Sequence, residues 1–263
     1  NAQGLVENVQ ILSSNLVQNG DFSEEGVQEV SNGSFSQEGV ELLSQPVNIV
    51  TDFNPNGGST IIDADTFETF GGTLDGIANK SSSFSLIEGR SYKLVIEGNT
   101  TSDGFTIGSY SYGNEYGSGF GTHYFVASGL QATRLWIRQQ TSGITNITSF
   151  SLREVGQDWV LGTGWSIAEN KAVAANVDNT FLAQNSILTS GKTYKITYTI
   201  QDYSSGSIRF RASLVNGSTN SGNGTYTDYI VSGGTQFALQ GLNTFNGSIT
   251  NISVKEVGMD WTL

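Results

Sequence analysis

A block of sequence in the middle of the chain recurs near its end, and this repeat restricts the possible folds more than any other feature. Residues Ile147–Trp159 reappear 102 residues later as Ile249–Trp261, with Glu-Val-Gly and Asp-Trp conserved between the two copies. At the same spacing, Gly89–Leu94 returns as Gly191–Ile196. Matched blocks in the same order indicate two homologous modules, so both parts of the chain are expected to share one fold.

Each module has the alternating pattern of β-strands. Apolar and polar residues alternate along Tyr194–Ile200 and Ile208–Ala212, and Gly-Ser, Asn-Gly and Gly-Gly pairs separate such runs. About eight short strands in roughly a hundred residues are typical of a two-sheet jelly roll. We therefore predict an all-β chain with two tandem β-sandwich modules, module 1 at residues 45–158 and module 2 at residues 159–263.

The N-terminal stretch contains a shorter repeat. Asn19–Val27 and Asn32–Val40 both read Asn-Gly-x-Phe-Ser-x-Glu-Gly-Val, and each copy offers too few apolar residues for a core of its own. We predict that residues 1–44 form an extended arm or linker that becomes ordered only against a neighbour. The alternative is an early strand pair of module 1. Because the closing Trp159 leads directly into the next module, we also expect these 263 residues to belong to a longer modular array.

The composition excludes several partners. The 24 acidic and 12 basic side chains give a net charge of −12, a field that repels nucleic acids and anionic lipid surfaces. The chain has no cysteine, which excludes disulfides and thiolate chemistry. From the net charge we expect no nucleic-acid binding. No run of about 18 apolar residues is present, so we expect no membrane insertion either.

Several of these segments carry a family resemblance. Leu16–Phe22 resembles the start of carbohydrate-binding-module-like jelly rolls of the galactose-binding type. Gly164–Ile167, Gly191–Ile196 and Ile249–Trp261 are similar to tandem modules in tail, fibre and other virion proteins of tailed bacteriophages. The resemblance implies a β-sandwich with a structural or adhesive role and frequent homo-oligomers, and it supplies no catalytic motif.

The resemblance leads to two functional hypotheses. The first is a non-catalytic structural or decorating protein on the virion surface, as a fibre, capsid-surface protein or tail appendage. It would act through oligomeric packing with its own copies and with other virion proteins. The alternative is a carbohydrate-binding adhesin module that recognises host-surface glycans.

The sequence offers little for catalysis or metal binding. His123 is the only histidine, it lies in a predicted strand, and no nucleophile motif accompanies it. Two carboxylates could support glycoside hydrolysis, but Asp63 and Asp65 lie in no recognisable cleft pattern. We predict no enzyme and no cofactor. Asp63 and Asp65 are kept as weak candidates for a structural calcium ion, because carboxylate oxygens suit that cation.

Aromatic residues around a glycine-rich segment are candidates for ligand or partner binding. Residues 113–121 are predicted to be a flexible loop between strands, and the matching part of module 2 has no aromatic ring. Sugars bind to flat aromatic faces, so we single out four residues here: Tyr110, Tyr112, Tyr116 and Phe120.

Residues shared by both copies are expected to serve the common fold. The pairs Tyr92/Tyr194 and Trp159/Trp261 are therefore assigned to core or intermodule packing. Trp136 has Ala238 as its counterpart, and residues that occur in one copy only are free to specialise.

The strand alternation around Trp136 places it on the face opposite Leu135 and Ile137, so we expect it to point outward. We favour an intersubunit contact over a binding platform for this side chain. Arg209 and Arg211 flank Phe210 and are likewise expected to point outward, toward acids of another chain or solvent.

Overall fold

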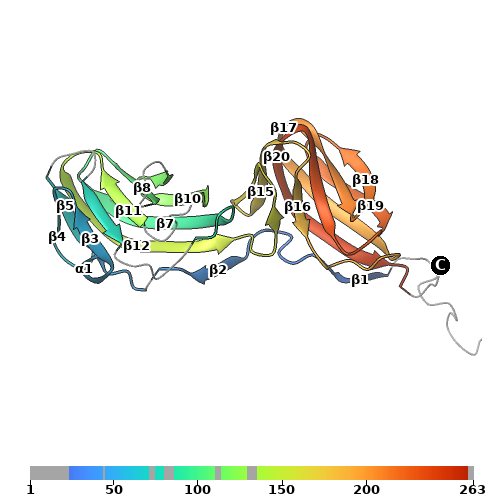
Figure 1. Ribbon diagram of the computed structural model, residues 1–263, viewed down its shortest axis with the longest axis horizontal. Helices are drawn as coiled ribbons and strands as arrows, with labels where there is room; N and C mark the ends of the chain where they lie inside the picture. The colour runs from blue at the N-terminus through green and yellow to red at the C-terminus, as the bar shows by residue number, and fades with distance from the viewer. Residues whose placement is uncertain are drawn as a thin grey trace, which may run out of the picture.

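The computed structural model describes residues 24–43, 45–70, 75–79, 86–109, 114–128 and 135–259. These residues are mostly β-strand, with one four-residue helix, and form two β-sandwich modules placed end to end along the long axis (Figure 1). The predicted all-β class with tandem sandwiches is confirmed. No helix in the described part of the chain is long and apolar enough to cross a membrane.

The two sheets of module 1 are separate. One has the strand order β10-β7-β12-β5-β4, with β2 paired to β12, and the other has the order β3-β6-β11-β8-β9. The elements are β2 (Glu38–Glu41), α1 (Ile49–Asp52), β3 (Phe53–Asn56), β4 (Ser59–Ile61), β5 (Thr66–Thr69), β6 (Gly76–Asn79), β7 (Ser91–Thr100), β8 (Phe105–Ser109), β9 (Glu115–Ser118), β10 (Gly121–Val126), β11 (Leu135–Gln139) and β12 (Gly143–Val155).

The sheets of module 2 are joined because two long strands take part in both. The N-terminal half of β17 pairs with β19, its C-terminal half pairs with β18, and β20 lies beside β17 throughout. The elements are β13 (Val160–Leu161), β14 (Trp165–Ala168), β15 (Lys171–Val177), β16 (Phe181–Gln184), β17 (Thr193–Ala212), β18 (Val215–Asn220), β19 (Gly224–Val231) and β20 (Phe237–Val257).

The long strands change sheet where the backbone leaves the extended conformation. In β17 the pairing register shifts after Gln201, and Asp202 has φ +52°. In β20, Asn243 and Thr244 have φ values of +56° and +58°. Residues in the left-handed region interrupt a ladder and bend a strand. At the corresponding places, module 1 divides the same strands into β7 and β8 and into β11 and β12.

Each module encloses its own apolar core, formed by the inward positions of alternating strands. Tyr92 and Tyr194 are fully buried, and their hydroxyl oxygens accept hydrogen bonds from the backbone N–H groups of Ile87 and Thr189, at 2.8 Å in both modules. The predicted packing role of this shared pair is confirmed. Trp159 is also buried, whereas its counterpart Trp261 lies outside the described residues.

The described part of the N-terminal arm supplies an edge strand to each module. Strand β1 (Glu25–Gln28) pairs with β20 of module 2, with Glu25 opposite Val257. Thirteen residues later, β2 pairs with β12 of module 1, with Glu38 opposite Val155. Because Val155 and Val257 are equivalent in the 102-residue repeat, the two arm copies dock at the same place on the two modules (Figure 1).

The ionic contacts of the two arm strands repeat as well. The carboxylate of Glu25 lies 2.5 Å from Lys195 Nζ and 3.1 Å from Lys255 Nζ. The carboxylate of Glu38 lies 2.6 Å from Lys93 Nζ and 3.9 Å from Arg153 Nε, the equivalent cations of module 1. Each arm copy thus carries a glutamate that bridges two neighbouring strands of its module.

Between these strands the arm is fixed at the module junction. Phe35 is buried with its ring centroid 5.2 Å from that of Trp159, and Trp159 Nε1 donates to the carbonyl of Asn32 at 3.2 Å. Ser31 and Gln184 exchange two hydrogen bonds, at 3.0 and 2.6 Å. We expected the arm to become ordered only against a neighbour. Instead, residues 24–43 pack on both modules of their own chain.

Candidate functional site

Trp136 is placed on the face that the sequence predicts but is not exposed. Its side chain lies on the face opposite Leu135 and Ile137, yet it is only 4% exposed, so the exposure expected for an outward-pointing tryptophan is wrong. The neighbour on β8 is Gly108, and a Cβ there would lie 2.6 Å from Trp136 Cζ2. The Arg138 guanidinium covers the ring, 4.0 Å from its centroid. The indole is therefore enclosed by its own module.

The aromatic group around residues 113–121 does not form an exposed platform in the described residues. Tyr116 is buried and stacked on Phe125, with the centroids 3.8 Å apart, and Phe120 lies edge-on to Phe105 at 4.8 Å. Tyr110 and Tyr112 lie outside the described residues. The segment predicted as a loop is in large part β9, which pairs with β8, and the start of β10, which pairs with β7 in the other sheet. The Tyr116 ring anchors β9 in the core.

The two arginines of β17 make contacts within their own chain. Arg209 Nη2 donates to Gln240 Oε1 at 2.7 Å, and the Arg211 guanidinium lies 5.4 Å from the Phe181 ring centroid. Both side chains are half-buried on the outer face of their sheet. They were expected to point outward, toward acids of another chain or solvent. They lie on the outer face, where their guanidinium groups contact side chains of neighbouring strands, and a contact with another chain stays a prediction.

The weak calcium candidates occupy a turn between β4 and β5. Asp63 Oδ1 accepts from the Asp65 backbone N–H at 3.2 Å, and Asp65 Oδ1 accepts from Asn146 Nδ2 at 2.8 Å. Hydrogen bonds lower the pKa of Asp63, and the bond from the Thr66 side chain contributes most to this shift. Within the described ranges, no three His, Asp or Glu residues are grouped so that they could hold a metal ion. A structural calcium ion at this turn stays a prediction.

His123 lies in β10, as the sequence predicts, and faces β9. Its Nε2 is 3.1 Å from the carbonyl oxygen of Gly119, and its ring fills the space above Gly117, where a Cβ would collide with it. The imidazole thus packs between two strands of module 1. In module 2, Asp228 takes the place of His123 and Ser218 the place of Gly117, as the strand registers show.

This difference creates a group of polar residues between β18 and β19 that the sequence reasoning missed. We call it the polar edge; its members are Tyr198, Ser218, Asn220, Tyr226 and Asp228. Ser218 Oγ donates to an Asp228 carboxylate oxygen, and Asn220 Nδ2 donates to the Tyr198 hydroxyl at 3.0 Å. The signal that could have revealed it is the alternation of Tyr226, Asp228 and Ile230 on one face of β19.

The aromatic members of the polar edge are fixed by burial and hydrogen bonding. The Tyr198 and Tyr226 centroids lie 5.9 Å apart, and the Tyr226 hydroxyl shares its single proton between the carbonyls of Ser221, at 2.7 Å, and Gly222, at 3.0 Å. Burial raises the pKa of Tyr198 to about 12, so this hydroxyl is neutral at ordinary pH. Tyr226, Asp228 and Asn220 are each half-buried, which leaves part of every side chain accessible to a ligand.

Module 1 closes the equivalent space with rings. Tyr116 corresponds to Gly217 of β18, where a Cβ would collide with the Phe210 ring. The stacked Tyr116 and Phe125 rings fill the gap between β9 and β10. The accessible polar edge is therefore specific to module 2, where the corresponding region is lined by hydroxyl, carboxamide and carboxylate groups.

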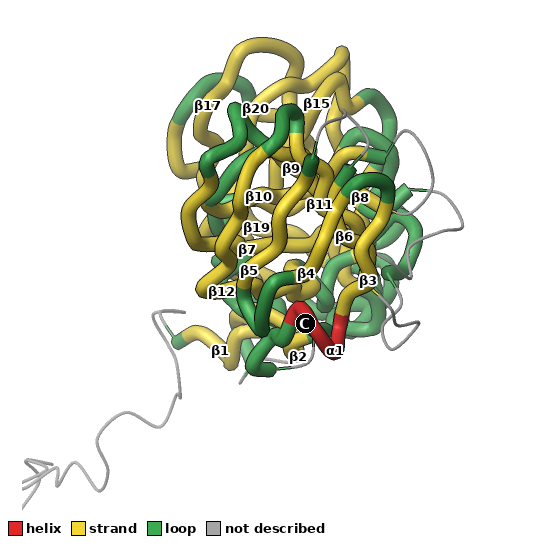
Figure 2. The backbone as a smooth tube through the Cα atoms, turned by 90° about the vertical axis from the view of Figure 1, so that its left-hand side faces the viewer, coloured by secondary structure: helices red, strands yellow, loops and turns green. Residues whose placement is uncertain are grey.

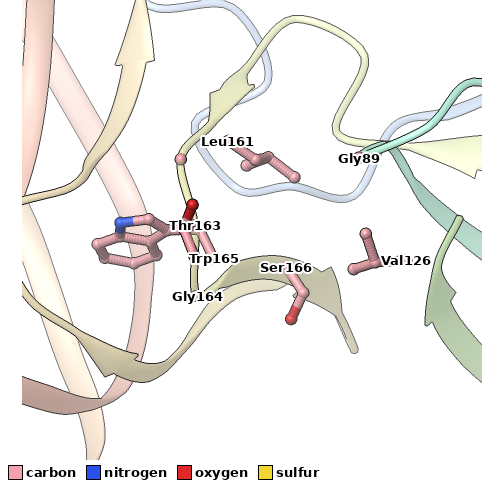
Figure 3. A pocket seen from close by; sticks show the side chains of 8 residues that line it. Gly89, Val126, Leu161, Thr163, Gly164, Trp165 and Ser166 are labelled. Carbon is pink, nitrogen blue, oxygen red and sulfur yellow. The ribbon is translucent and has the colours of Figure 1, made fainter. Parts of the chain in front are cut away.

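A groove of about 440 Å³ lies at the junction of the modules (Figure 3). Val126 of module 1 faces Leu161 and Ser166 of module 2 across it, and Figure 3 shows the Trp165 indole turned away from Val126 and Ser166. The lining residues are Gly89, Val126, Leu161, Gly162, Thr163, Gly164, Trp165 and Ser166, none of which is charged. Without an accessible ring or a charged group, this groove offers little to orient a polar ligand.

Comparisons with known proteins give fold-level likeness only. No family model matches the sequence, and no curated protein matches it. Among solved structures, the chain is similar to the tandem CBM22-1 and CBM22-2 modules of Xyn10C from Paenibacillus barcinonensis. The identity is 10%, the TM-score is 0.32, and the match covers 84% of this chain and 99% of that chain.

A second solved structure is the tandem CBM51 modules of Sp3GH98, a family 98 glycoside hydrolase from Streptococcus pneumoniae. Here the identity is 9%, the TM-score is 0.24, and the match covers 85% of this chain and 97% of that chain. With TM-scores this low the two-module structures do not superpose as wholes, and neither likeness supports a statement about function.

Proposed function

We propose that the chain is a non-catalytic carbohydrate-binding protein whose second module binds a neutral glycan at the polar edge. The arrangement of Tyr226 carries this proposal: its half-buried ring shares one face of β19 with Asp228 and lies 5.9 Å from the Tyr198 ring, whose hydroxyl holds the carboxamide of Asn220. Sugars place their apolar faces on such rings while their hydroxyl groups exchange hydrogen bonds with carboxylate and amide groups.

The charge of the protein favours a neutral ligand. The net charge of −12 repels anionic polysaccharides at long range, and the polar edge adds the carboxylate of Asp228. A carboxylate with free lone pairs accepts hydrogen bonds from sugar hydroxyl groups, which neutral hexoses and pentoses supply in number. The proposed ligands are therefore uncharged oligosaccharides.

The same arrangement argues for binding without hydrolysis. Glycosidases use two carboxyl groups on opposite sides of the scissile bond, about 5 to 10 Å apart. Among the five residues of the polar edge, Asp228 is the single carboxylate, and its two oxygens already accept one hydrogen bond each, from Ser218 Oγ and from the Tyr229 backbone N–H. A bound sugar would be held at this edge with no acid and base pair to cleave it.

The proposal is tested on an array of neutral and charged glycans, with the intact chain and the variant Tyr226→Ala. We expect the intact chain to bind neutral glycans and the variant to lose about tenfold or more of its affinity, because an aromatic anchor is removed. The control is Tyr229→Ala, since Tyr229 lies on the same strand but on the opposite face. Equal loss in both tyrosine variants, or binding to no glycan at all, would refute the site.

A second role, as a structural or decorating part of a tailed-phage particle, is favoured by the arm. Its two strands and Phe35 join both modules into one elongated unit, as a fibre or surface protein requires. In this role the chain would lie on the virion surface among its own copies and other virion proteins. Immunogold labelling of purified particles tests this role: labelled particles support it and consistently unlabelled ones contradict it.

A further inference from the structure

The polar edge is short, and its length limits what it can bind. Its accessible side chains occupy two alternate positions on each strand: Ser218 and Asn220 on β18, Tyr226 and Asp228 on β19. Alternate residues of a strand lie about 7 Å apart. Figure 1 shows β18 and β19 on the side of module 2 that faces away from module 1, so the edge is open to a ligand from solvent.

The loop between β18 and β19 closes the first end of the polar edge. The Tyr226 hydroxyl is bonded to the backbone carbonyls of Ser221 and Gly222 in this loop. The loop is also held to β17, because Asn223 Oδ1 accepts a hydrogen bond from the Tyr203 backbone N–H at 3.0 Å. A ligand that lies on the Tyr226 ring therefore meets the loop at the hydroxyl end of that ring.

Apolar groups close the second end. Gly217 precedes Ser218 on β18, and a Cβ on Gly217 would collide with the Phe210 ring, which packs directly on the strand. Ile230 follows Asp228 on the same face of β19, is only 6% exposed and belongs to the core of module 2. The accessible polar groups therefore stop at Ser218 and Asp228.

Between these two ends the edge offers one ring and one carboxylate. Tyr198 is fully buried, so Tyr226 supplies the accessible aromatic face. Each Asp228 oxygen accepts one internal hydrogen bond and has a second lone pair. Asn220 donates one N–H to Tyr198 and has a second N–H and a carbonyl oxygen. A single sugar ring, stacked on Tyr226 with its hydroxyl groups on Asp228 and Asn220, uses all of these groups.

The equivalent edge of module 1 offers no continuation of this site in the described residues. Its strands β9 and β10, the counterparts of β18 and β19, lie side by side (Figure 2). The stacked rings of Tyr116 and Phe125 and the imidazole of His123 fill the space between them. A glycan that is bound at the polar edge of module 2 therefore meets no second polar edge on module 1.

We infer that the polar edge binds one terminal residue of a neutral oligosaccharide and not an internal stretch of the chain. A residue at a chain end carries one linkage and an internal residue carries two, so the terminal residue brings more hydroxyl groups to Asp228 and Asn220. The loop and the Phe210 ring block both directions along the strands, so the remaining residues of the glycan extend into solvent. The inference rests on the proposed function and specifies which part of the glycan is recognised.

Isothermal titration calorimetry with the full chain tests this inference. The probes are the methyl glycosides of glucose, galactose, mannose and xylose, their linear oligosaccharides of up to about six residues, and soluble linear polymers of about fifty residues. For each sugar that binds, we expect dissociation constants per mole of glycan chains to agree within about threefold over the whole series. A gain in affinity of about tenfold or more with length overturns the inference, because it shows that internal or additional residues are bound.

Two exposed asparagines just outside the polar edge provide matched control variants. Asn223 lies in the closing loop, and Asn216 lies beyond Gly217 on β18. We expect Asn223→Ala and Asn216→Ala to bind the methyl glycoside and the longest oligosaccharide as the wild type does. Asn220→Ala should weaken the binding of both ligands by the same factor, about fivefold. Weaker binding of the long oligosaccharide alone, in either outer variant, also overturns the inference.

The outcomes distinguish this inference from the proposed function. Affinity that rises with chain length leaves a glycan site at the polar edge but removes its restriction to chain ends. Binding to none of these neutral sugars contradicts the proposed function, and the inference falls with it.

Discussion

Trp136 lies over Gly108, its direct partner on the neighbouring strand, and the glycine leaves the space that the indole occupies. Module 2 reverses the sizes at the same two positions, where Ala238 is paired with Arg211. A large side chain in one copy is therefore matched by a small one across the strand pair. Cross-strand pairs of this kind are the unit in which a sheet surface is packed.

The variant Trp136→Ala is expected to destabilise the protein without affecting glycan binding. Truncating a buried tryptophan removes its contacts and leaves a cavity, which costs about 3 to 5 kcal/mol of unfolding free energy. The polar edge lies in module 2, so its ligand affinity should stay within about twofold. Urea unfolding and a glycan titration measure the two quantities. A cost below about 0.5 kcal/mol would show that the indole is exposed.

Phe35→Ala is expected to loosen the arm and destabilise the junction. The ring is buried against Trp159, and its removal should cost about 3 to 5 kcal/mol. Phe70→Ala is the matched control, because Phe70 is well exposed and its truncation should cost about 0.5 kcal/mol or less. Chemical denaturation of both variants gives the comparison, and similar costs for the two would contradict the buried position of Phe35.

Acid is expected to release strand β1. Hydrogen bonds from Lys195 and Lys255 lower the pKa of Glu25 below its ordinary value, so the folded arm binds this proton more weakly than the free arm does. The stabilising contribution is present above the ordinary glutamate pKa and is lost as the pH falls through the lowered value. Hydrogen-exchange protection of the β1 amides, compared at about pH 7 and about pH 3, measures this.

The variant Glu25→Gln separates this titration from general acid unfolding. We expect its β1 protection to be low at both pH values, whereas Glu97→Gln, at an exposed position of β7, should behave as the wild type does. If β1 of the wild type keeps its protection in acid while the core stays folded, the ion pairs of Glu25 do not hold the arm.

Stability is expected to fall at high pH because of Tyr198. Burial raises the pKa of its hydroxyl to about 12 from an ordinary value of 10.0, so the folded state holds the proton more tightly than the unfolded state. The contribution is complete below about pH 10 and is lost as the pH rises toward 12, by an amount on the order of 2 to 3 kcal/mol. Denaturant unfolding of the wild type and of Tyr198→Phe between these pH values measures this loss. An equal change of the unfolding free energy with pH in both proteins would contradict the raised pKa.

Much of the fold follows from the repeat and the strand alternation. The blocks around Tyr92 and Tyr194 define equivalent strands, and the alternation around Trp136 places its side chain on the correct face. Burial on that face was not predictable from one strand, because it depends on Gly108 in a neighbouring strand. The same holds for Tyr116, whose position over the core depends on the pairing of β9 with β8.

The docking of the arm could have been anticipated in part. The sequence shows the thirteen-residue repeat, and it shows cations at equivalent positions of both modules, such as Lys93 and Lys195. The sequence does not show that these cations lie close to the edges of β12 and β20, where the two arm strands pair. The polar edge could not be predicted for the same reason. Ser218 and Asp228 come together because β18 and β19 pair with the two halves of β17.

A nitrogen–proton correlation titration of the labelled chain with neutral oligosaccharides tests the proposed glycan site most directly. We expect saturable shifts confined to β18 and β19 around Asn220, Tyr226 and Asp228, and we expect Asp228→Asn to reduce the affinity about tenfold. Shifts centred on the junction groove near Val126 and Leu161, or no shifts with any neutral oligosaccharide, would contradict the account.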